Sequence, residues 1–138
     1  MKAIQLIIIF FFSVFCFSQS AVDKKIERFF QVYQVNSSDA IDYLFEDNKW
    51  MENQFEEIVG LKYQLFEFQK ELGEYYGYEK LYEKSLGKSI KEIVYVVKYN
   101  RMPLRFRFHF YKAKDNWTVL NFYYDGNFMD ELFDTIKK

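Results

Sequence analysis

The chain has 138 residues, of which 50% are hydrophobic and 22% aromatic, and its formal net charge is −1 at pH 7. It is long enough for one domain, whose core can be built largely from aromatic residues: the full chain has 17 Phe, 12 Tyr and 2 Trp, most of them after residue 20. A charge balance this close to zero argues against a general attraction to nucleic acid or to anionic membranes, so we expect no nucleic-acid partner.

The chain begins with MKAIQLIIIFFFSVFCFSQS, which has the composition of a secretory signal peptide. One lysine precedes the apolar run Ile4–Phe17, and small residues suited to cleavage follow at Ser18 and Ser20. A membrane anchor is the alternative, but a spanning helix needs about 20 apolar residues and this run is shorter. We therefore expect residues 1–20 to be removed and residues 21–138 to form one exported domain, periplasmic or secreted, with no transmembrane segment.

Cleavage would also remove Cys16, the one cysteine of the chain. The exported domain would then have no disulfide, no thiol nucleophile and no thiolate metal site. Its single histidine, His109, excludes a metal site built on several histidines. We accordingly predict no metal, no cofactor and no catalytic residue.

Apolar residues at helical spacing predict three helices in the first half of the domain. The first extends over Val22–Tyr33, and NSSD at 36–39 offers caps and a break before a short helix over Ala40–Phe45. The third runs over about Glu52–Leu72, and Gly73 follows it where a C-cap glycine belongs. The expected buried stripe of this third helix comprises Phe55, Ile58, Val59, Leu61, Leu65, Phe66, Phe68 and Leu72.

After Gly73 the hydrophobic period changes from that of a helix to the two-residue period of a strand. Four strands are predicted: an irregular edge strand YYGYEKLYEKSL, then IKEIVYVVKY, LRFRFHFYK and WTVLNFYYD. The turn DGN at 125–127 ends the sheet, and the amphipathic stretch 128–136 predicts a short C-terminal helix.

Two short loops, at Arg101-Met102 and at 114–116, set the expected strand register. The expected pairs are Val97–Phe106, Tyr95–Phe108, Ile93–Phe110, Phe110–Leu120, Phe108–Phe122 and Phe106–Tyr124. One face of the sheet then consists of apolar and aromatic side chains and must pack on the helices, because a one-residue slip would exchange the two faces. This face comprises Ile93, Tyr95, Val97, Tyr99, Leu104, Phe106, Phe108, Phe110, Leu120, Phe122 and Tyr124.

These elements predict an α+β fold, with N-terminal helices packed on a curved four-stranded antiparallel sheet and a short C-terminal helix. The element order over Val22–Asp125 resembles the cone-shaped nuclear-transport-factor-two-like superfamily, which includes ketosteroid isomerase and scytalone dehydratase. WTVLNFYYD is similar to the W-x-V-x-x-F last strand of many secreted members. The resemblance implies a cone that often dimerises through the outer face of its sheet, and a binding or accessory role. The stretch 128–136 departs from the simplest version and would suit a cover over the mouth of the cone.

The polar side of LRFRFHFYK lies on the opposite face of the predicted sheet. There Arg107 is expected opposite Tyr123, and Arg105 opposite Asp125, as cross-strand pairs. Arginine and aromatic residues together are typical of interface cores, so we predict a homodimer interface, with a solvated face or a site for a partner protein or anion as alternatives. The predicted interface residues are Arg105, Arg107, His109, Tyr111, Trp117 and Tyr123.

Tyrosines on the apolar face raise a second candidate site, because a buried phenol needs a hydrogen-bond partner. They either line the core with internal partners or line a pocket that orients a small apolar ligand. The predicted pocket residues are Tyr95, Tyr99, Phe108, Phe122 and Tyr124.

Two functions are consistent with these features. The first is an exported, non-enzymatic binding module that forms a homodimer and holds a small apolar ligand or a partner protein. The alternative is an enzyme of the isomerase or dehydratase type, with a tyrosine-lined pocket and one helix carboxylate such as Glu67. It requires that carboxylate to point into the cone.

Overall fold

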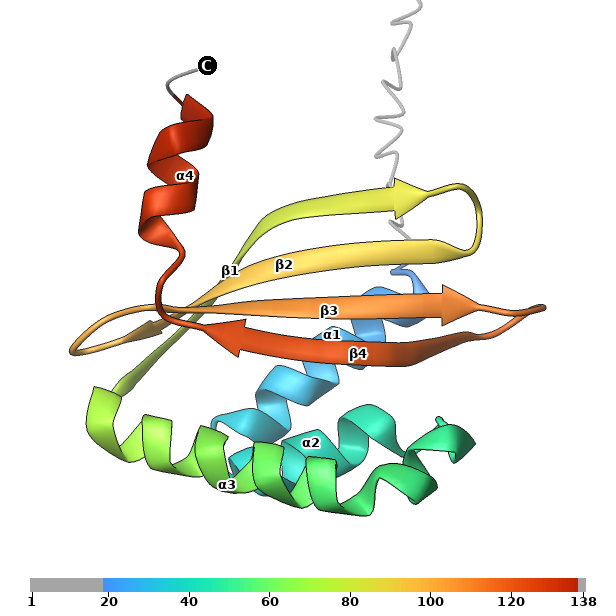
Figure 1. Ribbon diagram of the computed structural model, residues 1–138, viewed down its shortest axis with the longest axis horizontal. Coiled ribbons are helices and arrows are strands. Elements are labelled where there is room, and N and C mark those ends of the chain that lie inside the picture. The colour runs from blue at the N-terminus through green and yellow to red at the C-terminus, as the bar shows by residue number, and fades with distance from the viewer. Residues whose placement is uncertain (1–18, 137–138) are drawn as a thin grey trace, which may run out of the picture.

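The computed structural model describes residues 19–136, so most of the predicted signal peptide lies outside the described residues (Figure 1). Its elements follow one another in this order: α1 (Ala21–Tyr33), α2 (Ser37–Phe45), the 3-10 helix η1 (Lys49–Gln54), α3 (Phe55–Leu72), β1 (Tyr75–Leu86), β2 (Ile90–Tyr99), β3 (Leu104–Lys112), β4 (Trp117–Asp125) and α4 (Met129–Ile136). The predicted α+β fold is confirmed: helices precede a four-stranded antiparallel sheet that is not closed, and a short helix ends the chain.

Side-chain caps fix where the helices begin. The Ser20 hydroxyl accepts a hydrogen bond from the backbone of Asp23 at the start of α1, and the side chain of Asn36 accepts two at the start of α2. The predicted break between the first two helices is therefore confirmed. Gly73 ends α3 with a φ of 80°, a conformation that glycine adopts without a steric penalty. The expected start of the third helix is corrected, because η1 precedes α3 and the α-helical turns begin only at Phe55.

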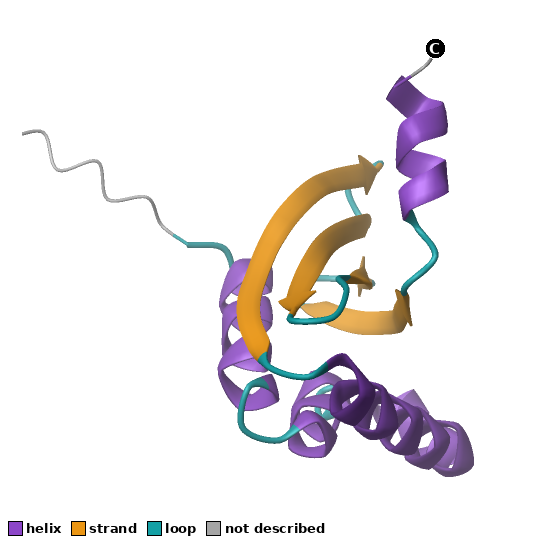
Figure 2. Cartoon of the chain, turned by 90° about the vertical axis from the view of Figure 1, so that its left-hand side faces the viewer, coloured by secondary structure: helices purple, strands orange, loops and turns teal. Residues whose placement is uncertain are grey.

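The strands form a simple meander in the order β1-β2-β3-β4. β1 is the irregular edge strand that the sequence predicts, with register shifts between Tyr75 and Gly77 and between Lys80 and Tyr82. Helices α1, α2 and α3 lie on one side of the sheet, and α4 leaves it on the other side (Figures 1 and 2). We call these sides the inner and outer faces. The expected cover over the mouth of a cone is thus replaced by a helix on the outer side.

The register between β2 and β3 differs from the prediction by two residues. Val97 pairs with Leu104 rather than with Phe106, and Tyr95 pairs with Phe106 rather than with Phe108. A shift of two leaves every side chain on its predicted face, because the side-chain period of a strand is two. The predicted faces of β2 and β3 are therefore correct although the predicted pairs are wrong.

The predicted faces of the first half of β4 are wrong, because β4 contains a bulge. Phe108 pairs with Phe122 and Phe106 with Tyr124, as predicted, but the register shifts beyond His109 and Phe110 pairs with Val119. Val119 is consequently buried at 2% exposure, whereas Leu120 is 43% exposed. The bulge also moves Trp117 from the predicted outer face to the inner side, where it packs against the core.

Aromatic rings fill the space between α1 and the inner face. Phe29 lies edge-on to Phe108, with centroids 5.2 Å apart, and the Phe106 ring lies 5.1 Å from that of Phe122. Such edge-to-face contacts are favourable beyond the burial of area. The inner face is thus a closely packed core rather than an open cone interior.

α3 buries less of its surface than the sequence predicts. Leu65 and Leu72 are buried, but Phe55 is 72% exposed, and Val59, Phe66 and Phe68 are also exposed. The reason is its place at the periphery of the helical layer, where α2 and the end of the sheet cover only one side of it (Figures 1 and 2). The prediction that this whole stripe is buried is wrong.

Candidate functional site

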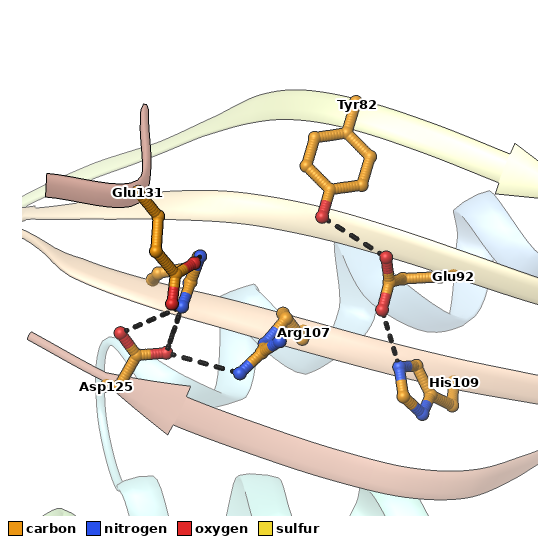
Figure 3. Close-up of polar contacts among 7 residues, drawn as sticks. Tyr82, Glu92, Arg107, His109, Asp125 and Glu131 are labelled. Atoms are coloured by element: carbon orange, nitrogen blue, oxygen red, sulfur yellow. Dashed lines mark hydrogen bonds and ion pairs between the residues drawn. The ribbon is translucent and has the colours of Figure 1, made fainter. Parts of the chain in front are cut away.

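Polar side chains from neighbouring strands meet on the outer face, where the sequence predicts an interface (Figure 3). Arg105, Arg107 and His109 stand at alternate positions of β3, so all three point away from the core. Val94 lies between Tyr82 and Arg107 in the sheet and is fully buried, so these longer side chains lie down over the strands.

Arg105 is the most buried of these charges, with 8% of its side chain exposed. Its Nε and Nη2 atoms donate to both carboxylate oxygens of Asp125 over 3.1 and 3.2 Å, and Nη1 donates to Glu131 of α4 over 2.6 Å. Its guanidinium also lies 5.5 Å from the ring of the buried Phe128. Hydrogen bonding to Arg105 lowers the pKa of Glu131. Arg105 therefore fixes the start of α4 to the sheet.

Arg107 is held much more loosely. Its Nη2 lies 3.7 Å from Asp125, its guanidinium 6.0 Å from the Tyr123 ring, and 36% of its side chain is exposed. Its Nε atom is buried without a hydrogen-bond partner among the described residues. A guanidinium carries five N–H donors, and the described residues leave part of the donor capacity of Arg107 unused.

A second polar chain crosses three strands beside Arg107. The Tyr82 hydroxyl donates to Glu92 over 3.2 Å, and the other oxygen of Glu92 lies 2.7 Å from Nε2 of His109. Burial favours the neutral form of Glu92, but hydrogen bonds from His109 and Tyr82 outweigh it and lower its pKa. Burial and the Glu92 carboxylate together raise the pKa of Tyr82. These hydrogen bonds stabilise the anionic form of Glu92 at neutral pH.

The structure brings most of the predicted interface residues together. Arg105, Arg107, His109 and Tyr123 share the outer face, with Arg107 opposite Tyr123 and Arg105 opposite Asp125 as predicted. Tyr111 continues the same row of β3 and is exposed. Trp117 does not join them, because the bulge turns it to the inner side. The cluster that results offers hydrogen-bond donors, acceptors and two tyrosine rings on one surface.

The predicted pocket residues lie in different parts of the core and of its margin. Phe108 is fully buried among aromatic rings, while Tyr99 bonds through its hydroxyl to that of Tyr33 and receives a 3.4 Å hydrogen bond from Gln69. Burial raises the pKa of Tyr33 and of Tyr99. These buried tyrosines have internal hydrogen-bond partners, as the core-packing alternative requires.

The other three candidates lie at the margins of the core. Tyr95 borders a shallow pocket of about 340 Å³ beside Asp23 and Lys80, and burial raises its pKa to about 12. Phe122 and Tyr124 border a separate groove next to α3, where the Tyr124 hydroxyl donates to Gln64 over 3.3 Å. Binding of an apolar ligand at any of these residues stays a prediction.

Glu67, the carboxylate of the enzymatic alternative, faces solvent. It pairs with the exposed Lys70 one turn along α3 over 3.1 Å, and 43% of its side chain is exposed. Glu67 therefore does not supply an acid or base to the inner face. Among residues 19–136, no three carboxylate, histidine or cysteine side chains gather as a metal site would require.

Sequence reasoning missed the partners Tyr82 and Glu92, and also the groove beside α3. The role of Glu92 could not be predicted, because the predicted register places it opposite Tyr111, two residues from its actual partner His109. Glu92 was the available signal as a charged residue on the outer side of β2, but without the correct register its partner could not be named.

Comparison with protein-family models, with curated proteins and with solved structures finds no match for this chain. The nuclear-transport-factor-two-like resemblance therefore stays a prediction from element order and the last strand. Within the described part of the chain, no helix combines the length and the apolar character needed to cross a membrane.

Proposed function

We propose that this chain is an exported, non-enzymatic interaction module that pairs with a second copy through the outer face of its sheet. Export rests on the N-terminal 20 residues, and kinship with the nuclear-transport-factor-two-like superfamily, whose members often dimerise through the same face, is part of the proposal. The observation that carries it is Arg107, which is half-buried beside Tyr123 with donors left over.

The composition of the outer face suits an interface with itself. Arg105 and Arg107 are interspersed with Glu92, Asp125 and Glu131, so neither sign of charge dominates. In a two-fold dimer each patch meets its own copy, and a single-sign patch would be repelled. Arginine and tyrosine at the middle of the patch are the residues enriched in interface cores.

α4 supports the same assignment. The helix projects on the outer side of the sheet, away from α1–α3, and Arg105 holds its first turn through Glu131 (Figure 2). Its sequence repeats apolar residues at the spacing of one helical face: Met129, Leu132, Phe133 and Ile136. An eight-residue amphipathic helix has little stability alone, because most helical stability comes from packing of the apolar face. Met129 at its start is exposed, so a second outer face would add apolar contact there.

Native mass spectrometry of the exported chain, purified from a cell envelope rather than refolded, tests the proposal. We expect a dimer that Arg107→Glu converts to a monomer, because four carboxylates would then gather on one patch. Arg28→Glu is the matched control. Arg28 is exposed on α1, and its side chain donates a hydrogen bond to Gln31.

Arg107→Ala provides a milder second variant, and it should weaken the dimer without reversing a charge. Circular dichroism should show the same folded content for all three variants. A monomeric parent chain, or equal loss of dimer in Arg28→Glu, would contradict the proposal. A monomer that carries extra mass would instead indicate a bound ligand.

A further inference from the structure

A groove runs between α3 and the free edge of the sheet. Its wider part, about 400 Å³, lies between Leu61, Gln64 and Phe68 of α3 and the end of β4. A second part of about 290 Å³ continues it toward η1 and shares Leu61, Phe122 and Tyr123 with the first. The two parts adjoin at these shared residues, and together they border α3 from Gln54 of η1 to Phe68.

The strand wall of this groove is the backbone edge of β4. Five consecutive residues, Asn121–Asp125, border the groove. Alternate side chains of a strand point to opposite faces, and here Phe122 belongs to the core while Tyr123 pairs with Arg107 on the outer face. Residues of both faces border the same space only where that space lies along the edge. β4 is the last strand in the sheet order and has β3 as its one neighbour among the described strands.

The two edges of the sheet differ in their protection. β1 has two register shifts and four charged residues in its middle, which are features that discourage further strand pairing: Glu79, Lys80, Glu83 and Lys84. β4 has one register shift, beside Leu120, and no charge from Trp117 to Tyr124. Its first half is partly covered, because Asn48 donates to the carbonyl of Val119 over 2.7 Å. The second half, Asn121–Asp125, is where the groove opens.

We infer that the groove binds an extended peptide segment of another protein, which adds a fifth strand to β4. Backbone hydrogen bonds to the edge would supply affinity, and alternate apolar side chains would enter the space between β4 and α3. Such a site lies between a strand edge and a helix, and it shares Tyr123 and Asp125 with the margin of the outer face.

Charge indicates which segment fits. The two charged residues that border the groove, Glu57 and Asp125, are both acidic. Asp125 is already engaged by Arg105, so Glu57 sets the charge of the open end. A segment with a basic residue at that end is therefore favoured, and an acidic one is disfavoured.

A second copy of β4 is the poorer occupant by the same criterion. An antiparallel pairing centred on Tyr123 would place Asp125 of the partner subunit opposite Asn121, which borders the same part of the groove as Glu57. The partner's strand would bring no basic residue to Glu57, because Asn121–Asp125 contains none. We therefore assign the groove to a foreign, basic strand.

The test uses the exported chain carrying Arg107→Glu, so that outer-face association does not interfere. The probe is a short, blocked peptide that alternates Val and Thr between two terminal Lys residues. We expect saturable amide shifts in NMR spectra that centre on Asn121–Asp125, with slowed amide exchange along this edge. The same peptide with a central Pro should bind at least about tenfold more weakly, because proline cannot donate to a strand ladder.

Charge variants sharpen the result. Glu57→Lys should weaken binding of the Lys peptide about threefold to tenfold and improve binding of a matching Glu peptide. Glu56→Lys is the control, because it makes the same charge change at the residue that precedes Glu57 in α3 and that does not line the groove. Phe68→Ala, which removes an apolar wall, should weaken both peptides.

Three outcomes would overturn the inference. The first is equal binding of the proline peptide, which would mean that no strand is added. The second is an equal effect of Glu56→Lys and Glu57→Lys. The third is a dimer of the Arg107→Glu chain that Phe68→Ala dissociates, which would assign the groove to a second copy. The first two results leave the mass measurement on the outer face unaffected, whereas the third would also contradict the monomer expected for the Arg107→Glu chain.

Discussion

On the inner face of the sheet, Phe106 and Phe108 meet the rings of α1, whereas on the outer face Arg105, Arg107 and His109 of the same strand meet other polar side chains. One stretch, LRFRFHFYK, thus supplies both the centre of the core and the centre of the candidate site. The inner contacts are apolar and fully dehydrated, while the outer contacts remain open to water on one side.

The difference shows which contacts stabilise a small domain that has no disulfide among its described residues. Burial of large rings provides most of the favourable free energy, because each buried aromatic side chain contributes about 1.5–3 kcal/mol. Partly exposed ion pairs contribute about 0–1 kcal/mol each, since water screens them. Substitutions of partly exposed residues on the outer face should therefore cost less stability than substitutions in the core.

Phe106→Ala should have the largest effect on stability. Phe106 is fully buried and touches the rings of Tyr33 and Phe122 at 5.3 and 5.1 Å, so truncation leaves a cavity in the core. We expect the free energy of unfolding to fall by about 3–5 kcal/mol in denaturant titrations. Tyr123→Ala on the outer face is the matched control and should cost less than about 1 kcal/mol. Equal losses would show that the outer face is as structural as the inner one.

Arg105→Ala should destabilise more than Arg107→Ala, although the two arginines are neighbours on one face. Removing Arg105 leaves Asp125 without its two-pronged donor and releases Glu131, at a cost of about 1.5–3 kcal/mol. Arg107 makes one long ion pair, and its removal should cost less than about 1 kcal/mol. Denaturant titration at neutral pH compares them. The reverse order would make Arg107 a structural residue and weaken its assignment to an interface.

Tyr33→Phe should cost about 1 kcal/mol, because it removes the hydroxyl that bonds to Tyr99 in the core. Replacing both tyrosines by Phe should recover part of that loss, since no unpaired hydroxyl then remains. Unfolding titrations of the two single variants and the double variant measure the coupling. Additive losses would mean that the two hydroxyls do not act as a pair.

The same pair predicts an alkaline limit to stability. Burial raises the pKa of Tyr33 and Tyr99 in the folded chain, so folding keeps their protons while the unfolded chain releases them above about pH 10. Stability is full below that pH and falls as the pH rises further. Thermal melts across this range should show a shallower fall for the double Phe variant. Parallel curves would indicate that other tyrosines, such as Tyr75 with its pKa raised to about 12, dominate.

Glu92→Gln should have the smallest effect and should appear at acid pH. The folded pKa of Glu92 is lowered, so its stabilisation is present above its unfolded pKa of about 4.3 and is lost as the pH falls through the folded value. The parent chain should lose up to about 1 kcal/mol more than the variant between neutral pH and about pH 3. Chemical unfolding at several pH values measures this difference. If the parent chain and the variant lost the same stability at acid pH, the Tyr82–Glu92–His109 hydrogen bonds would not be maintained in solution.

Much of the candidate site was predictable from cross-strand pairing. Arg107 lies opposite Tyr123 and Arg105 opposite Asp125 in both prediction and structure, although the loop itself pairs Lys112 with Trp117 and the bulge in β4 restores the predicted register. The pair between His109 and Glu92 was not predictable, because the two-residue error between β2 and β3 changes partners without changing faces. A pattern of period two carries no information about shifts of two.

The groove was beyond the sequence for a different reason. The apolar residues of α3 fall on more than one side of the helix, and only packing decides which side is covered. Phe68 and Leu61 border the groove because the helix axis lies alongside the edge of β4. No local pattern specifies that placement.

The sequence by itself determined the order of the elements, the caps at Asn36 and Gly73, and the two faces of β2 and β3. These follow from local backbone preferences and from hydrophobic periodicity, which act within a few residues. The tertiary structure decided the strand register, the bulge that exchanges Val119 and Leu120, and the positions of α3 and α4 (Figure 1). Each of these depends on how distant segments fill space together, and periodicity alone leaves several such arrangements equally acceptable.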